Sequence, residues 1–217
     1  MKILVVNPNT TVSVSDLLAR RVGAAVGAAA EVETITARFG AAYISSEASY
    51  VVAAHAALDA CDAHVDAHGR PDAIIVGCFG DPGVFALREA LALAVIGLAE
   101  AAMREAAAHG RFAIVTGGAA WGPMLLRLAR ALDLADRLTT VEIVAATGAE
   151  LAADPLRAIV TLGEACARAA KGVDAVILGG AALAGMADAI APRVGVPIVD
   201  SVDAAARAAL TALAALR

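Results

Sequence analysis

The chain has 217 residues, a length that suits one large or two small domains and can bury a sizeable core without disulfides. Hydrophobic residues make up 60% of it, mostly as an excess of alanine, and the formal net charge at pH 7 is −5. Acidic and basic residues are spread along the chain and only 3% is aromatic, a pattern untypical of nucleic-acid-binding proteins. The chain has three cysteines, and this odd number argues against a disulfide framework.

The sequence pattern also predicts neither a membrane-spanning helix nor a signal peptide. The longest uncharged stretch, residues 112–126, is shorter than a membrane-spanning helix and contains helix-breaking glycine and proline. The apolar run at the N-terminus is too short for a signal peptide. We therefore expect a soluble cytoplasmic protein that acts on a small molecule and has neither a nucleic-acid nor a membrane partner. The alanine-rich helices favour close helix packing and a homo-oligomer.

Short runs rich in β-branched residues alternate along the chain with alanine-rich segments of helical pattern. The expected strands are residues 2–6, 31–37, 73–77, 94–98, 112–116, 139–145, 175–180 and 196–200. The expected helices lie near residues 14–27, 46–68, 83–91, 99–109, 121–133, 155–171, 183–191 and 202–216. Continuous apolar strands that alternate with helices are typical of parallel sheets covered on both faces. The sequence therefore predicts an α/β fold.

An internal repeat divides this pattern into two halves. Residues 72–78 (DAIIVGC) resemble residues 174–180 (DAVILGG), and the same offset places Ile96 on Ile198 and Gly83 on Gly185. The repeat predicts two pseudo-symmetric lobes, each a parallel sheet flanked by helices, with the active site in the cleft between them. The lobe boundaries are expected at residues 1–97 plus 201–217 for the first lobe and residues 98–200 for the second.

Four loops that follow expected strands are candidates for the site. They are rich in small residues, Asn and Thr, and comprise residues 7–11, 77–83, 116–122 and 179–185. Ligands of such folds bind outside the carboxyl ends of the strands, where backbone N–H groups and helix N-termini can bind an anion or a carbonyl oxygen. Glycine and asparagine also serve tight turns, but four similar loops at equivalent places favour a binding site.

Cys78, in the second of these loops, has two interpretations. A thiol near a helix N-terminus is expected to have a lowered pKa, and its thiolate can abstract a proton from carbon or attack an electrophile. Free cysteine is also among the most buried residue types, so Cys78 could be a small core residue. Its position alone does not separate the two interpretations.

The segments LVVNPNTT, ARFGAAYISSEA, VGCFGDPGV, VIGLAEAA, ILGG and GVPIVDSVDAA together resemble the aspartate/glutamate/hydantoin racemase superfamily, closest in pattern to hydantoin racemases. The resemblance runs from Met1 to about Ala209. It implies a two-lobed fold and cofactor-independent proton transfer at a carbon next to a carbonyl. It also implies a pair of cysteines that face each other across the substrate, and the first of these matches Cys78.

The second cysteine position of the family matches Gly180, which has no proton to transfer. Other groups for the opposite face are Tyr43, Glu47, His55, or Asp200 with Ser201, although none is at the expected place. The alternatives to a racemase are a single-cysteine decarboxylase or lyase of the same superfamily, and a non-catalytic small-molecule binding protein.

The leading hypothesis is an isomerase in which Cys78 is the acid/base or nucleophile, acting on a 5-substituted hydantoin, allantoin or an amino acid. The residues expected to bind the substrate oxygens or to form the wall are Asn7, Asn9, Thr10, Tyr43, Ile44, Phe79, Thr116, Gly117, Gly180 and Ala181. No metal, flavin or pyridoxal phosphate is implied. Cys61, His64 and His68 share one face of a helical pattern, but no fourth ligand is signalled, so we expect no metal site there.

Overall fold

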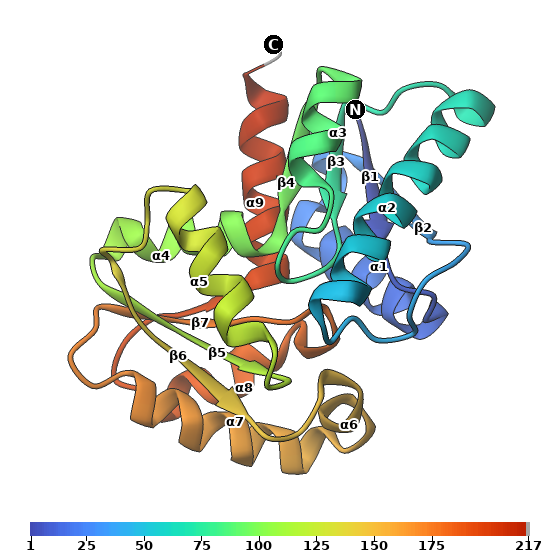
Figure 1. The fold of residues 1–217 in the computed structure, drawn as a ribbon. Helices are drawn as coiled ribbons and strands as arrows, with labels where there is room; N and C mark the ends of the chain where they lie inside the picture. Colours follow the sequence, from blue (N-terminus) through green and yellow to red (C-terminus); the bar gives the residue numbers. More distant parts are fainter. Residues whose placement is uncertain (216–217) are drawn as a thin grey trace.

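Two four-stranded parallel sheets form the framework of the computed structural model, which describes residues 1–215 (Figure 1). The first sheet contains β1 (Lys2–Asn7), β2 (Glu31–Thr36), β3 (Ala73–Val76) and β4 (Ala94–Gly97), in the order β2-β1-β3-β4. The second contains β5 (Phe112–Gly117), β6 (Leu138–Val144), β7 (Ala175–Leu178) and β8 (Ile198–Asp200), in the order β6-β5-β7-β8. Every strand pair is parallel. The eight expected strands and the α/β fold class are confirmed.

The α-helices follow the strands in alternation. They are α1 (Val12–Val26), α2 (Glu47–His68), α3 (Val84–Leu91), α4 (Leu98–His109), α5 (Trp121–Ala131), α6 (Gly148–Ala153), α7 (Pro155–Ala169), α8 (Met186–Ile190) and α9 (Ser201–Ala214). The helix expected at residues 183–191 is broken into α8 and two 3₁₀ turns, Ala181–Leu183 and Ala191–Arg193. Residues 216 and 217, the ends of the expected last helix and first lobe, lie outside the described residues. The helix α6 was not expected.

The alternation of side chains along each strand explains the layers. Ile3 and Val5 of β1 belong to a central core that α1 and α9 cover and that continues to the inner face of the second sheet. Leu4 and Val6 belong to a separate outer core under α2 and α3. The second sheet has its own outer core, in which Val115 packs with residues of α7 and α8. Both sheets are thus covered on both faces, as their continuous apolar strands require.

The helices α4 and α9 connect the lobes by crossing between them. The helix α4 follows β4 of the first sheet but packs against β5, β7 and β8 of the second. The helix α9 follows β8 of the second sheet but packs against α1, β3 and β4 of the first. The two helices also pack against each other, so the lobes share one continuous core. The division of the chain at residues 97 and 200 stays a prediction.

Equivalent contacts in the two lobes support the internal repeat. The Asp72 carboxylate accepts a hydrogen bond from the Lys2 N–H, and the Asp174 carboxylate accepts one from the Arg111 N–H, at the starts of β1 and β5. Gly83 and Gly185 each lie directly before a helix, and each glycine has a left-handed backbone conformation, with φ of 84° and 85°.

One detail of the expected repeat is wrong. Ile96 pairs with Ile75. Ile198 pairs with Val176, which lies one residue before the position equivalent to Ile75. Ile96 therefore corresponds to Val199, and the second lobe has one additional residue between its third and fourth strands.

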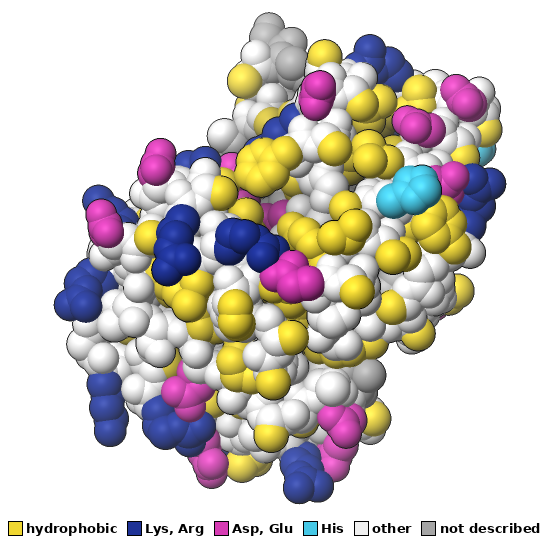
Figure 2. Space-filling model, in the orientation of Figure 1, with side chains coloured by type: hydrophobic (Ala, Val, Ile, Leu, Met, Phe, Trp, Pro, Cys, Tyr) yellow, Lys and Arg dark blue, Asp and Glu magenta, His cyan; other side chains and the backbone are white. Residues whose placement is uncertain are grey.

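Among the described residues, no helix is both long and apolar enough to cross a membrane. Figure 2 shows charges of both signs interspersed on one face of the molecule.

Candidate active site

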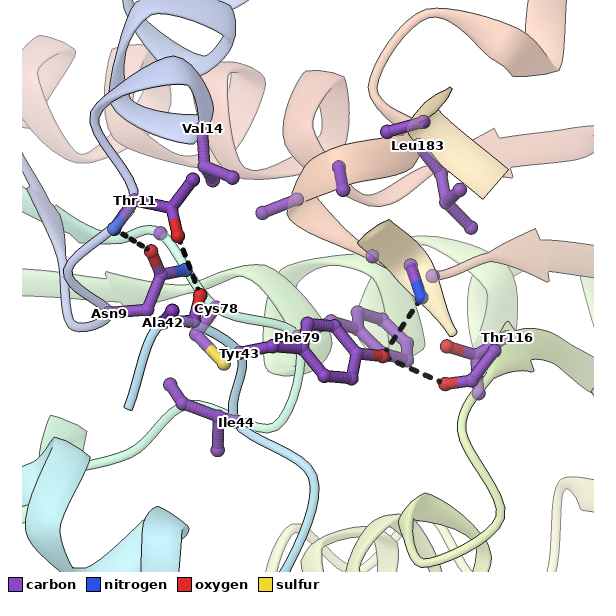
Figure 3. Close-up of a pocket in the computed structure, with 18 of the residues that line it drawn as sticks. Asn9, Thr11, Val14, Ala42, Tyr43, Ile44, Cys78, Phe79, Thr116 and Leu183 are labelled. Carbon is purple, nitrogen blue, oxygen red and sulfur yellow. Dashed lines mark hydrogen bonds between the residues drawn. The ribbon is translucent and has the colours of Figure 1, made fainter. Parts of the chain in front are cut away.

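A cavity of about 340 Å³ lies between the two lobes, where the four candidate loops meet (Figure 3). The loops after β1, β2 and β3 line its first-lobe side, and the loops after β5 and β7 line its second-lobe side together with α6. The expected site residues that line it are Asn9, Tyr43, Ile44, Cys78, Phe79, Thr116, Gly117, Gly180 and Ala181. The structure thus brings together residues that are far apart in the sequence, because parallel strands place their carboxyl ends at one edge of each sheet.

Asn7 lies beneath the cavity and does not line it, which corrects our expectation. Its side chain is fully buried, and its Nδ2 donates to Asn9 Oδ1 at 3.0 Å, to the Thr11 carbonyl at 3.1 Å and to Ser15 Oγ at 3.0 Å. Its Oδ1 accepts from the Asn9 N–H at 3.2 Å. Asn7 therefore positions the loop, and Asn9 is the asparagine that lines the cavity.

Thr10 is also absent from the cavity wall, because its N–H donates to the Ala41 carbonyl at 3.2 Å and the chain turns there. Thr11 lines the cavity in its place, and its hydroxyl donates to the Ala42 carbonyl at 2.7 Å. The Asn9 Oδ1 accepts from the Thr11 N–H at 2.8 Å, so the Nδ2 of Asn9 is left as the donor available to a ligand.

Cys78 follows β3 directly and is 7% exposed, toward the cavity. The expected lowering of its pKa is wrong. Burial, and secondarily the nearby charge of Asp81, raise the pKa of the Cys78 thiol well above its ordinary value. The reason is that α3 begins only at Val84, after the whole loop, so no helix N-terminus follows the thiol directly. Cys78 is therefore a neutral thiol, and its thiolate would be a strong base.

Asp81 fixes the loop that carries Cys78. Its N–H donates to the Cys78 carbonyl at 3.1 Å, and its carboxylate accepts from the N–H groups of Ala99 and Glu100, at 2.8 Å and 2.7 Å, at the start of α4. Gly97 precedes α4 and has to be a glycine, because a Cβ there would collide with the Asp81 carboxylate. Burial raises the pKa of Asp81 to about 7, although its backbone hydrogen bonds act in the opposite direction.

Gly180 occupies the place in the second lobe that corresponds to Cys78, but its backbone has a different conformation. Its φ of 147° lies in a region that residues with a side chain rarely adopt, whereas Cys78 does not have a positive φ. A Cβ on Gly180 would also lie 3.2 Å from Leu183 Cγ and Cδ1. Leu183 therefore occupies the space that a side chain at position 180 would need.

Tyr43 reaches across the cavity from the first lobe to the second. Its hydroxyl accepts a hydrogen bond from the Gly148 N–H at 3.1 Å and lies 3.4 Å from the Gly117 carbonyl, to which it can donate (Figure 3). Tyr43 and Cys78 are the ionisable side chains among the described residues that line the cavity. The remaining lining side chains are apolar or neutral polar.

The other groups considered for the second face have partners elsewhere. Glu47 forms an exposed ion pair with Arg127 at 2.5 Å. His55 is exposed and packs its ring against Phe39. Asp200 accepts from the N–H groups of Val202, Asp203 and Gly185 and so caps α9. Ser201 Oγ accepts from the Gly180 N–H at 3.3 Å, which supports the backbone behind the cavity without lining it.

Two backbone donors lie on opposite sides of the cavity at equivalent positions. Phe79 follows Cys78, and Ala181 follows Gly180. Among residues 1–215, neither N–H has a hydrogen-bond acceptor, whereas those of Gly179 and Gly180 are paired. Free N–H groups beside a reacting carbon are suited to binding a carbonyl oxygen that gains negative charge.

Several lining residues were not expected from the sequence. Among them are Val14, Gly148 and Ala152, whereas Thr11 and Leu183 lie in the candidate loops but were not singled out. Gly148 and Ala152 belong to α6, whose start carries a capping box of Thr147 and Glu150 that the sequence shows as T-x-x-E. Phe79 packs across the cleft on Gly179, where a Cβ would collide with its ring. Such contacts between lobes have no local sequence signal.

The fold and the cavity define a class of protein: a two-lobed α/β enzyme in which one thiol lies in a small, largely apolar cavity between the lobes. Residues 3–209 match the family model described as Asp/Glu/Hydantoin racemase, so the chain belongs to this family and is an isomerase of the racemase class.

Relatives and solved structures agree with this assignment. A hydantoin racemase of Paenarthrobacter aurescens is 28% identical over 212 residues, which cover 96% of this chain and 89% of the relative. An allantoin racemase structure from Pseudomonas fluorescens superposes with a TM-score of 0.92 at 30% identity, covering 100% of this chain and 92% of that one. An allantoin racemase from Klebsiella pneumoniae gives a TM-score of 0.90 at 28% identity and covers 100% and 88% of the two chains.

Proposed function

We propose that this chain racemises a cyclic ureide, a 5-substituted hydantoin or allantoin, by proton transfer at the carbon next to a carbonyl. Cys78 is the acid/base on one face of that carbon. The observation that carries the proposal is the placement of the Cys78 thiol in the interlobe cavity, next to the unpaired N–H of Phe79. A base near the carbon and a donor for the developing oxyanion are the two requirements of such a reaction.

The neutral lining of the cavity supports a ureide over a free amino acid. An amino acid would bring a carboxylate and an ammonium group, whose burial needs charged or strongly polar partners. A hydantoin ring has uncharged carbonyl and N–H groups, which suit the Asn9 side chain and the backbone donors. Apolar side chains such as Val14 and Leu183 suit the substituent on the ring. The names of the hydantoin and allantoin racemases to which this chain is similar support the same substrate class.

The raised pKa of Cys78 fits its proposed role. Removing a proton from carbon needs a strong base. Once the thiol has given its own proton to solvent, the buried Cys78 thiolate is more basic than a thiolate in water. The Phe79 N–H then stabilises the enolate oxygen, and the thiol that has formed can return the proton to the same face. This half of the reaction gives exchange without racemisation.

Tyr43 is our candidate for the opposite face. It lines the cavity, it is ionisable, and its oxygen is held in place by the Gly148 N–H. The phenol would protonate the enolate on the face away from Cys78, and the phenolate would take the proton in the reverse direction.

The backbone of Gly180 favours one alternative, proton transfer on a single face. Because φ at Gly180 disfavours any side chain, the second lobe supplies no group equivalent to Cys78. A single-thiol enzyme of this kind would exchange the α-proton with retention of configuration, and it would suit decarboxylation followed by protonation from one side.

Incubation of one enantiomer of allantoin and of a 5-substituted hydantoin in D₂O tests the proposal. We expect the wild type to racemise at least one of them with deuterium uptake at the α-carbon, after subtraction of the rate without enzyme. Cys78→Ala should lose about 10²–10⁴-fold of this rate. Cys61→Ala, which removes a thiol buried outside the cavity, should retain it. Exchange with retained configuration would establish the single-face alternative, and no exchange of either ureide would contradict the proposal.

A further inference from the structure

A second cluster of ligand-type side chains lies in the first lobe, where His64 and His68 near the end of α2 approach Glu33 of the edge strand β2. Glu33, His64 and His68 each place one potential ligand atom within 4.8 Å of the others. We propose that this cluster binds a divalent transition-metal ion, with Zn²⁺ as the best match to two imidazoles and a carboxylate. None of the three residues lines the interlobe cavity.

The two histidines are arranged as ligands of one ion. They are four residues apart on α2, and their rings stack with centroids 4.7 Å apart. His68 Nδ1 lies 3.3 Å from the His64 carbonyl, and since a carbonyl oxygen can only accept, Nδ1 has to carry the proton. The Nε2 of that ring is then the nitrogen that offers a lone pair to an ion. An imidazole that donates one N–H to a backbone carbonyl is the usual arrangement of a metal-binding histidine.

The Glu33 carboxylate is held from its outer side by an ion pair with Lys2. Lys2 Nζ contacts Glu33 Oε2 at 2.8 Å, so the other oxygen, Oε1, points to His64 Nδ1 at 3.5 Å.

His64 has bonding capacity that the protein leaves unused. Its side chain is almost completely buried, yet its Nε2 has no hydrogen-bond partner among the described residues. The 3.5 Å contact between its Nδ1 and Glu33 is long for a hydrogen bond. A histidine buried for packing alone normally has its ring nitrogens paired. Neither ring nitrogen of His64 thus has a good partner in the protein, and Nδ1, which faces Glu33, is the nitrogen that an ion in this cluster would bind.

The geometry needs only a small adjustment to hold an ion. Zinc–ligand bonds of about 2.0–2.1 Å in a tetrahedron place ligand atoms about 3.3 Å apart. His68 is exposed at the last residue of α2, so its side chain can move inward and the ion can enter from solvent. Water would complete the coordination.

This site corrects the expectation that α2 carries no metal site, and its residues differ from the Cys61, His64 and His68 set weighed from the sequence. Cys61 is fully buried in the outer core of the first lobe and is not part of the cluster. Glu33 takes its place as the third ligand. Because Glu33 comes from β2, about thirty residues earlier in the chain, the local spacing of the helix could not indicate it.

Titration calorimetry with ZnCl₂ tests the proposal on the full chain, without a polyhistidine tag and after EDTA treatment. The Cys78→Ala background removes the cavity thiol as a competing ligand. We expect about one ion per chain, and at least tenfold weaker binding in His68→Ala and in Glu33→Gln. His109→Ala, which removes an exposed histidine at the end of α4, is the matched control and should bind as the parent does.

Two results would overturn the proposal: the absence of stoichiometric binding, or equal affinity in His68→Ala and the parent. Cobalt provides an independent readout through its visible spectrum. We expect a cobalt spectrum without a thiolate charge-transfer band. Such a band would place the metal on Cys61 or Cys166 and would contradict the assignment.

Discussion

Replacing Gly180 by alanine tests the point at which the second lobe departs from the first. The substitution places a side chain on a backbone with φ of 147° and ψ of 127°. Backbone strain of this kind costs of order 1–3 kcal/mol. The new Cβ would also lie 3.2 Å from two carbon atoms of Leu183, closer than ordinary van der Waals contact. We expect Gly180→Ala to lower the free energy of unfolding by about 2 kcal/mol.

Urea unfolding followed by circular dichroism measures this loss. Gly172→Ala is the matched control, because Gly172 also has a positive φ, 76°, but its Cβ would meet no atom within 4 Å. A double-mutant cycle with Leu183→Ala isolates the steric part, since removing Leu183 relieves the contact and leaves the backbone strain. Gly180→Cys should be destabilised in the same way. An unchanged free energy of unfolding in Gly180→Ala would refute the reasoning that this position excludes a second thiol.

Three further predictions follow from buried groups and helices. Because the folded-state pKa of Asp81, about 7, lies above the unfolded value, the stability that its protonated form contributes is lost as pH rises from about 4 to 7. The unfolding free energy of the wild type minus that of Asp81→Asn should therefore fall by up to about 1.4 kcal/mol per pH unit over that range. Urea unfolding measures both values, and a difference that stays constant with pH would contradict this. Alkylation of Cys78 by iodoacetamide, followed by mass spectrometry, should rise about tenfold per pH unit between pH 7 and 9, because burial raises the pKa of the thiol; a plateau below pH 8 would show an activated thiolate. Gly23→Ala should raise the unfolding free energy by about 0.5–1 kcal/mol, since Gly23 lies inside α1 with no atom within 4 Å of its new Cβ, and a loss of stability would contradict this.

The strands and their order along the chain could be predicted because each is a short, continuous apolar run. The pattern of β3, for example, is buried at every residue, and the loop after it could be identified as part of a cleft. The helix α6 was missed, although its T-x-x-E capping box was visible, because the segment is short and has no clear apolar periodicity. The bounds of the strands could be predicted from composition, whereas a short helix such as α6 can be found only from its capping residues.

The chemistry of single residues was less predictable than the fold. Asn7 and Asn9 are equally polar in the sequence, and only the hydrogen bonds of the turn show that Asn7 faces inward. The pKa of Cys78 depends on burial, and the sequence suggested a helix N-terminus instead. The contact of Tyr43 with Gly148 and the approach of Glu33 to His64 join distant segments, so no local pattern contained them.

Enantiomer-resolved deuterium exchange tests the central claim about Cys78 most directly. Each enantiomer of the ureide that the wild type racemises is incubated in D₂O with Cys78→Ala and with Tyr43→Phe. If Cys78 serves one face and Tyr43 the other, Cys78→Ala should stop exchange of one enantiomer, and Tyr43→Phe should stop exchange of its mirror image. Exchange of both enantiomers by Cys78→Ala at the wild-type rate would contradict the assignment of Cys78 as an acid/base.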